Sequence, residues 1–380
     1  MNIIRLCPVY YPYFKHGGSV VADYELDKAM VSQGHTVDVM TCKNKSDDLK
    51  FTSIAINHNI NYFSAFGNEL QGFSFSALFR LFIKLSKNKK NVDIVWFGGV
   101  WNFMTIFGPF VCRLFSVKYI ITPHGMLIPH LIGLKSSRLK NNVIKFFMRS
   151  NLEKAYKVHF TVEKELQETK KAVRANMDPV IFPLCFDLKK FDIDICSSEN
   201  KIKSDKIILS FIGRITGKKR LDLVFNALKM LPEATKNKLE FQIVGPDAEN
   251  LWNHDLYSEK NTGVTIKYLG PLYDHGLVKA YHDSDIFILC SESENFAISV
   301  VEAAYCHTVP LITKEVGVSE YFSSQCAVYA ELEQNDISEK IEYLVENPEI
   351  LAKYKLSARK VSEQFDSSFL PENYFLNKLA

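Results

Sequence analysis

Short apolar runs rich in β-branched and aromatic residues alternate along the chain with longer segments whose apolar residues recur at helical spacing. Ten of these runs are typical of buried strands, and they fall at 2–7, 36–41, 92–97, 117–122, 158–162, 206–213, 239–245, 264–270, 285–290 and 309–313. Helical patterns lie between them, such as 19–34, whose Gly34 suits a helix C-terminus. Strands that alternate with helices predict parallel sheets covered on both faces, here in two doubly wound blocks.

The length of 380 residues suits two domains of roughly 150–200 residues each. We expect an N-terminal domain over 1–190 and a C-terminal domain over 200–360, joined by the polar and charged stretch 183–206. A final helix of about 362–380 follows, and its packing back on the first domain is an open alternative. Because ligands bind beyond the carboxyl ends of parallel strands, we expect the functional site in a cleft between the two domains.

Charge is unevenly distributed along a chain whose net charge is only +3. Residues 1–195 contain 26 Lys and Arg against 16 Asp and Glu, or +10, whereas residues 196–380 contain 20 against 27, or −7. A basic half indicates contact with something anionic, although solvated charged faces explain the same count. The basic residues form no recognisable nucleic-acid-binding module, so we expect no nucleic-acid partner.

Two features bear on location. The eight cysteines are scattered without a C-x-x-C pair, and Arg5 interrupts the N-terminal apolar run too early for a signal peptide, so we expect a reduced, cytoplasmic protein. Residues 94–112 carry no charge and are long enough to span a bilayer. However, Gly98 and Gly99 end a strand-like run there, and the rest indicates a helix broken or bent near Pro109. We therefore expect no membrane span.

Two glycine-containing turns between a strand and a helix are candidate anion sites. The first contains Gly17 and Gly18, where the backbone can approach a ligand and a helix N-terminus offers N–H groups. The second, 212-IGRITGKKRLDL-223, carries Arg214, Lys218, Lys219 and Arg220, and four cations at a strand end suit a pyrophosphate. Neither matches the dinucleotide fingerprint or the P-loop, and plain turn chemistry or a solvated basic loop remains the alternative for each.

Three further polar residues stand at strand ends or just beyond them. His124 follows a strand end and precedes Gly125. A lone histidine is commonly structural, but its place after Pro123, in a loop at the expected cleft edge, favours a ligand role. In 291-SESENFAISVVEA-303, Glu294 would stand after a buried strand and Glu302 one to two turns inside the next helix. A polyhydroxylated ligand satisfies both carboxylates. The alternatives are a helix cap for Glu294 and a salt bridge to a neighbouring helix for Glu302.

Five segments together resemble the retaining glycosyltransferases of family 4, which have the GT-B fold of two Rossmann-like domains facing a cleft. They are 17-GG-18, 33-QGHTVDV-39, 123-PHGML-127, 213-GRITGKK-219 and 294-ENFAISVVE-302, the last matching the family's E-x(7)-E. The Pro-His-Gly-Met-Leu element is similar to that of bacterial enzymes that build capsular, exopolysaccharide or lipopolysaccharide chains. The resemblance implies transfer of a sugar, with retention of configuration, from a nucleotide-sugar to a saccharide or lipid-linked acceptor.

The resemblance also implies residue roles. Arg214 and Lys219 would bind the donor's pyrophosphate, with Gly17 and Gly18 reaching the same phosphates. Glu302 would hold the ribose, and His124 would contact the sugar near its reacting face. Glu294 and the N–H groups of Asn295, Phe296 and Ala297 would bind hydroxyls of the donor sugar. The chain departs from the family where Ala297 replaces a common Gly, at a cost of about 1 kcal/mol if the backbone there needs a positive φ.

No resident cofactor or metal is expected, because the two cations would do for the leaving group what a metal does elsewhere. The D-x-D pairs Asp192/Asp194 and Asp283/Asp285 match the metal motif of the other large glycosyltransferase fold, but they lie in the apparent linker and at a strand entry. The donor nucleotide is open, with UDP as the default. A nucleotide-sugar epimerase and a non-catalytic nucleotide-sugar-binding partner are alternatives on the same fold.

The stretch 73-FSFSALFRLFIKLSKNKKN-91 interleaves apolar residues with Arg and Lys. It predicts a basic amphipathic helix, which would place the protein peripherally on the inner face of the cell membrane near a lipid-linked acceptor. The alternative is a helix that covers the sheet with its charges in water.

Overall fold

The computed structural model describes residues 1–13, 17–43, 59–67, 71–133, 137–192, 206–252 and 257–380. The chain divides into two compact units, which are described separately. Unit 1 comprises Met1–Asp187 and Leu370–Ala380, and unit 2 comprises Leu188–Phe369. Most of the predicted join, including Asp194, lies outside the described residues, as does His16 beside the first glycine pair.

Unit 1 is built on a seven-stranded parallel sheet in the order β3-β2-β1-β4-β5-β6-β7. Its strands are β1 (Asn2–Leu6), β2 (Thr36–Cys42), β3 (Asn59–Phe63), β4 (Ile94–Gly98), β5 (Tyr119–Thr122), β6 (Lys157–Phe160) and β7 (Pro179–Ile181). The chain first winds outward from β1 to β3 and then in the other direction from β4 to β7. The direction therefore reverses between β1 and β4, which is where doubly wound sheets bind ligands.

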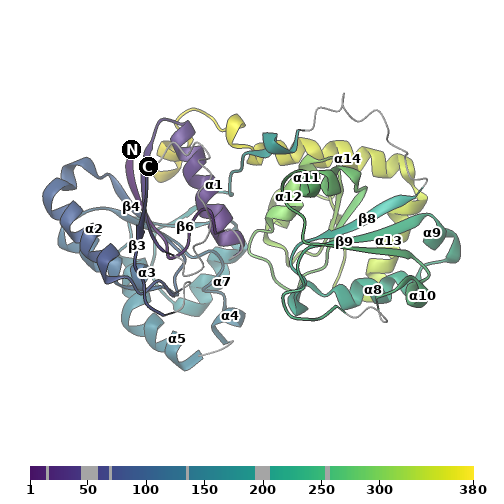
Figure 1. The fold of residues 1–380 in the computed structure, drawn as a ribbon, viewed down its shortest axis with the longest axis horizontal. Helices are drawn as coiled ribbons and strands as arrows, with labels where there is room; N and C mark the ends of the chain where they lie inside the picture. Colours follow the sequence, from purple (N-terminus) through teal and green to yellow (C-terminus); the bar gives the residue numbers. More distant parts are fainter. Residues whose placement is uncertain (14–16, 44–58, 68–70, 134–136, 193–205, 253–256) are drawn as a thin grey trace. The chain divides into compact units, whose positions relative to one another are not determined.

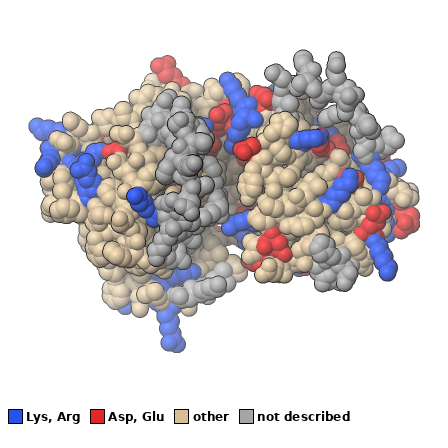
Figure 2. Space-filling model, in the orientation of Figure 1, with Lys and Arg blue, Asp and Glu red and all other residues tan. Residues whose placement is uncertain are grey.

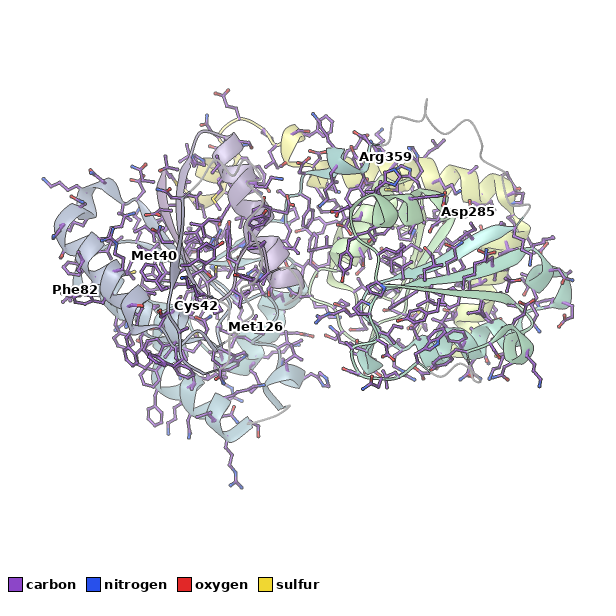
Figure 3. All side chains as sticks on the ribbon, in the orientation of Figure 1. Met40, Cys42, Phe82, Met126, Asp285 and Arg359 are labelled. Carbon is purple, nitrogen blue, oxygen red and sulfur yellow. The ribbon has the colours of Figure 1, made fainter. Side chains whose placement is uncertain are left out.

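Helices cover both faces of this sheet (Figure 1). One face packs on α1 (Gly18–Ser32) and α15 (Tyr374–Leu379), and Trp96 and Phe375 belong to that core cluster. The opposite face, with Met40 and Cys42 of β2, packs on helices that include α2 and α3 (Figure 3). The helices not yet bounded are α2 (Phe75–Asn88), α3 (Phe103–Leu114), α4 (Pro129–Gly133), α5 (Ser137–Val143), the π-helical turn η4 (Ile144–Met148), α6 (Arg149–Glu153) and α7 (Glu163–Val173).

The helix α3 is not broken at Pro109, contrary to that part of the sequence expectation. It runs from Phe103 to Leu114 with the proline inside. Proline lacks the N–H that would bond the carbonyl four residues earlier, at Thr105. The side-chain amide of Asn151 supplies that donor instead, because its Nδ2 lies 3.2 Å from the Thr105 carbonyl oxygen and 2.9 Å from that of Ile106. The uncharged stretch 94–112 is thus a strand and a helix, and no helix among the described residues is long and apolar enough to cross a membrane.

Unit 2 is built on a six-stranded parallel sheet in the order β10-β9-β8-β11-β12-β13. Its strands are β8 (Ile207–Ile212), β9 (Leu239–Val244), β10 (Thr265–Gly270), β11 (Ile286–Leu289), β12 (Val309–Ile312) and β13 (Val328–Tyr329). Here the direction of winding reverses between β8 and β11. The basic loop follows β8 and the Glu294 loop follows β11, so both reach the reversal point of the sheet.

The helices of unit 2 lie on both sides of its sheet (Figure 1). They are α8 (Leu221–Met230), α9 (Glu233–Asn237), α10 (Glu259–Thr262), α11 (Asp274–Asp283), α12 (Ile298–Tyr305), α13 (Gln334–Glu346) and α14 (Pro348–Ser362). The long helix α14 is tied to the strand entry by an ion pair in which Lys355 Nζ lies 2.5 Å from Asp285 Oδ1 (residue labelled in Figure 3). Two doubly wound parallel-sheet units confirm the predicted fold class.

Candidate donor site and the His124 turn

The basic loop of unit 2 begins where β8 ends. Gly213 has a φ of 156° and Arg220 a φ of 48°, and the one-turn helix η7 (Gly217–Lys219) lies between them. Arg214 is exposed, and its charge helps to lower the pKa of Lys219. The Arg220 guanidinium forms salt bridges with two carboxylates: Nη2 lies 3.0 Å from Asp222 Oδ2, and Nη1 lies 2.9 Å from Glu292 Oε1. Of the four predicted cations, Arg220 is therefore held by neighbouring carboxylates away from Glu294.

Glu294 binds two of the other cations. Its Oε1 lies 3.0 Å from Lys219 Nζ and 3.2 Å from Lys218 Nζ. Burial favours a raised pKa for Glu294, but the two ammonium groups outweigh it and the pKa is lowered. Burial lowers the pKa of Lys219, although Glu294 opposes that shift. The helix that follows has Ala297 at its N-cap without a side-chain cap hydrogen bond, so capping does not account for Glu294.

The loop from Glu294 to Ala297 is held by its backbone against residues 315–318. The Gly317 N–H donates to the Glu294 carbonyl oxygen at 2.9 Å, and the Val318 N–H donates to that of Phe296 at 3.1 Å. A Cβ at Gly317 would stand 1.7 Å from the Asn295 carbonyl oxygen, so only glycine permits this approach. Sequence reasoning missed Gly317, although a glycine shortly after a predicted strand is a recognisable signal.

Ala297 and Glu302 both lie where the E-x(7)-E spacing predicts. Ala297 has a φ of 68° and a ψ of 74°. The backbone there does need a positive φ, which is the condition under which alanine in place of glycine costs about 1 kcal/mol. Glu302 lies in the second turn of α12, and its Oε2 accepts a hydrogen bond of 2.8 Å from the Tyr281 hydroxyl. Burial and the Glu302 carboxylate raise the pKa of Tyr281 well above its ordinary value. The neighbouring helix thus supplies a tyrosine hydroxyl to Glu302, and this partner was not predicted.

In unit 1, the first glycine pair follows β1, at the reversal point of the other sheet, and His124 follows β5, the strand next to β4. Gly17, with a φ of 119°, precedes α1, and Gly18 is the first residue of that helix. One turn further along α1, Asp23 Oδ1 lies 2.9 Å from His124 Nε2. The approach of Asp23 requires glycine at the end of β4, because a Cβ on Gly98 would stand 2.1 Å from Asp23 Oδ2.

A second buried carboxylate holds the turn that carries His124. His124 and Gly125 both have left-handed backbones, with φ values of 53° and 72°. Glu165 accepts the Gly125 N–H at 2.5 Å and also both the N–H and the hydroxyl of Thr161 at 3.1 Å. Burial raises the pKa of Glu165. These bonds offset the cost of a non-glycine residue at positive φ, which is about 1–2 kcal/mol.

Arg5 completes the buried polar group of unit 1. Its guanidinium lies 3.5 Å from Asp23 Oδ1 and forms a bidentate pair with Asp27, whose other donor is the Tyr10 hydroxyl at 2.8 Å. Burial favours a raised pKa for Asp23, but His124 and Arg5 outweigh it, and the pKa is lowered. Asp23 is therefore a carboxylate that links the histidine to a buried cation. Sequence reasoning missed it, since a lone aspartate in a helix carries no distinguishing signal.

The two candidate D-x-D pairs are engaged in structural contacts wherever they are described. Asp192 pairs with Arg359, Asp283 with Lys279, and Asp285 with Lys355. Within the described ranges, no group of three or more His, Cys, Asp or Glu side chains is arranged to hold a metal ion.

The chain is similar to known glycosyltransferases. Residues 192–361 match the family described as Glycosyl transferases group 1. The chain is 22% identical over 356 residues, 90% of its length and 74% of the relative's, to the phosphatidylinositol N-acetylglucosaminyltransferase GPI3 subunit of Saccharomyces cerevisiae. It is 25% identical over 309 residues, 77% of its length and 79% of the relative's, to the N,N'-diacetylbacillosaminyl-diphospho-undecaprenol alpha-1,3-N-acetylgalactosaminyltransferase of Campylobacter jejuni.

Among solved structures, Anabaena Alr3699/HepE in complex with UDP superimposes with a TM-score of 0.75 at 15% identity, over 100% of this chain and 99% of that one. At this identity the likeness establishes the fold, which is that of GT-B glycosyltransferases. Residues 192–361 are therefore similar to glycosyl transferases group 1, in a chain whose two doubly wound units have the GT-B fold.

Proposed function

We propose that this chain is a glycosyltransferase that moves a sugar from a nucleotide-sugar to a saccharide or lipid-linked acceptor, with retention of configuration. The observation that carries the proposal is the cluster in unit 2 of Lys218, Lys219 and Glu294. The lysines come from the loop after β8 and Glu294 from the loop after β11, which are the two strands that flank the reversal point of the sheet. Cations beside a carboxylate suit a ligand that carries both phosphates and hydroxyl groups.

The chemistry asks for two kinds of stabilisation. The bond between the anomeric carbon and the donor's diphosphate breaks, and its electron pair leaves with the diphosphate. The acceptor hydroxyl oxygen bonds to the anomeric carbon, and its proton passes to an oxygen of the departing diphosphate. Lys219 and Arg214 would stabilise the charge that grows on the diphosphate, in the place of a metal ion. Glu294 and the N–H groups of Asn295, Phe296 and Ala297 would hold the sugar hydroxyls, and Glu302 the ribose.

The proposal also gives roles to three groups of unit 1. The N–H groups at Gly17 and Gly18 begin a fifteen-residue helix with no side-chain cap and suit the donor phosphates. His124 would contact the sugar near its reacting face. Asp23 would act as a positioning residue, since its carboxylate accepts from Nε2 and leaves Nδ1 of the histidine for the substrate.

The substrates are proposed from the relatives. HepE is described in complexes with UDP and with UDP-glucose, which supports a UDP-sugar as the donor. The yeast relative is named for phosphatidylinositol and the Campylobacter relative for a diphospho-undecaprenol substrate, which supports a lipid-linked acceptor. A UDP-sugar donor and a lipid-linked acceptor are both consistent with synthesis of a bacterial surface polysaccharide on the cytoplasmic side of the cell membrane.

A thermal-shift panel of UDP-, GDP-, ADP- and CDP-sugars tests the donor, because a bound ligand raises the melting temperature by mass action. We expect the UDP-sugars to raise it and Arg214→Ala and Lys219→Ala to abolish the shift. Arg220→Ala is the matched control, since Arg220 belongs to the same loop but is paired with Asp222 and Glu292. No shift with any donor, or an equal loss in the control, would refute the donor site. Conversion of UDP-N-acetylglucosamine to its epimer without acceptor would indicate an epimerase instead.

A further inference from the structure

Three helices of unit 1 present large aromatic side chains to solvent. We name these side chains the aromatic face, and they are Phe75, Phe79 and Phe82 of α2, Phe107 and Phe110 of α3, and Phe146 of η4. Phe75, Phe79 and Phe146 are 67%, 63% and 64% exposed. Exposed aromatic residues grouped in this way mark an interaction surface more often than a solvated one.

The aromatic face is one surface because ring contacts join the three helices. The Phe75 ring centroid lies 4.9 Å from that of Phe103, and Phe103 lies 4.8 Å from Phe107. The ring of Phe147 then bridges to α3, at 5.5 Å from Phe107 and 6.3 Å from Phe110.

Helical spacing separates this face from the core. On α2 the exposed rings fall at positions 75, 79 and 82, whereas Ala77, Leu81 and Leu85 are buried against the sheet. Figure 3 shows Phe82 at the outer edge of α2. The helix therefore has two apolar sides. One is buried against the sheet, whereas the rings of the other remain 40–67% exposed, although Phe75 and Phe82 touch Phe103 and Phe115.

The segment that carries the aromatic face is almost free of negative charge. Residues 70–152 contain twelve Lys and Arg (80, 84, 87, 89, 90, 113, 118, 135, 138, 140, 145 and 149) and a single acidic residue, Asp93. Asp93 accepts the Asn2 N–H at 2.7 Å beside the sheet. Among the twelve cations, Lys84 pairs with Asp38 and Arg149 pairs with Glu153. Lys87, Lys89 and Lys90, at the end of α2, are exposed. Figure 2 shows blue side chains at the outer edge of unit 1 near α2 and again below α5, with a broad tan surface between.

We propose that the aromatic face docks on the surface of an anionic lipid bilayer. Aromatic and aliphatic groups on helices that lie in the interface insert among the headgroups and upper acyl chains, while surrounding Lys and Arg attract the negative leaflet. The charge pattern decides against a second copy of the chain as the occupant, because a symmetric pair would bring two strongly basic surfaces together. The sequence pattern in 73–91 supplies only α2 of this surface, and the fold adds α3 and η4.

Docking on lipid goes beyond the proposed transfer, because vesicle binding requires neither donor nor acceptor. Flotation with vesicles of phosphatidylcholine alone and of phosphatidylcholine with about one third phosphatidylglycerol measures it. We expect the full chain to bind the anionic vesicles at low salt and to be released as salt is raised. We expect the triple variant Phe75→Ser, Phe79→Ser, Phe146→Ser to bind about tenfold more weakly or worse. The triple variant Lys87→Gln, Lys89→Gln, Lys90→Gln should lose most of the preference for anionic vesicles.

Matched controls come from unit 2. Leu356→Ser removes an apolar side chain that is 67% exposed, as is Phe75, and Lys314→Gln, Lys353→Gln, Lys360→Gln removes three exposed positive charges. Unchanged thermal unfolding shows that each variant is folded. The proposal is overturned if the unaltered chain ignores anionic vesicles at low salt, or if the controls weaken binding as much as the variants do. It is also overturned if sedimentation shows a dimer that the phenylalanine variant breaks while vesicle binding is absent.

Discussion

The ion pair between Lys219 and Glu294 leads to a prediction about the nucleotide alone. The two side chains are 12% and 14% exposed, and their charged atoms lie 3.0 Å apart. A diphosphate bound by Lys219 would therefore lie near a carboxylate that repels it. Replacing Glu294 with Gln keeps the shape of the side chain and removes this negative charge.

The size of the effect follows from the distances. With a phosphate oxygen within hydrogen-bond reach of Lys219 on the side away from Glu294, the carboxylate and the phosphate stand about 6 Å apart, and at an effective dielectric constant of about 20 they repel by roughly 3 kcal/mol. Partial exposure and salt reduce this repulsion, and we take about 1–2 kcal/mol as the net gain. UDP should thus bind the Glu294→Gln variant about 5- to 30-fold more tightly than the unaltered protein.

Isothermal titration with UDP, which has no sugar for Glu294 to hold, measures this affinity directly. Transfer from a UDP-sugar should slow in the same variant, since the proposed contact with the sugar hydroxyls is lost. Glu292→Gln is the control: this carboxylate stands two residues away, is half-exposed and pairs with Arg220, so its loss should leave UDP affinity within about twofold. Unchanged or weaker UDP binding in Glu294→Gln would show that the carboxylate orients Lys219 for the phosphate and does not compete with it.

Three further predictions concern stability. Arg5→Met leaves the buried carboxylate of Asp27 without its cation, so the free energy of unfolding in urea should fall by about 3–5 kcal/mol. Adding Asp27→Leu to the same chain should largely restore it. A fall below about 1 kcal/mol contradicts the burial of the pair. His159 is buried and its pKa is lowered to about 3, so the unfolded chain binds a proton that the folded chain refuses, and stability should fall by up to about 1.4 kcal/mol per pH unit as pH drops below about 6.5. In the variant His159→Phe, the free energy of unfolding should depend less steeply on pH over that range. A slope identical to that of the unaltered protein would contradict the role given to His159. Ala297→Gly relieves a positive φ and should raise the free energy of unfolding by about 0.5 kcal/mol in thermal melts, because the relief of about 1–2 kcal/mol exceeds the added entropy of the unfolded chain; a decrease would show that Ala297 is not strained.

The alternating pattern predicts the interior of both sheets and one edge strand, β10, but not the other three edges. All ten expected strands are present, and the three that the pattern does not reveal, β3, β7 and β13, each stand at the end of a sheet order. An edge strand has one strand neighbour and part of its surface in water, so it needs no continuous apolar run. The strand β3, with the sequence Asn-Ile-Asn-Tyr-Phe, and the two-residue β13 illustrate this.

Spacing along the chain by itself determined which groups stand at the strand ends: the basic loop after β8, Glu294 after β11, Glu302 one turn into α12, and His124 after β5. These positions follow because a strand end and a helix start are local events, set by the residues that form them. Only the tertiary structure decided the partners. It pairs Glu294 with Lys218 and Lys219 and leads Arg220 elsewhere, and it brings Asp23 to His124 across 101 residues of chain. Such contacts depend on the order of the strands in each sheet and on glycines that let two segments approach closely. The periodicity of apolar residues in the sequence reveals neither of these.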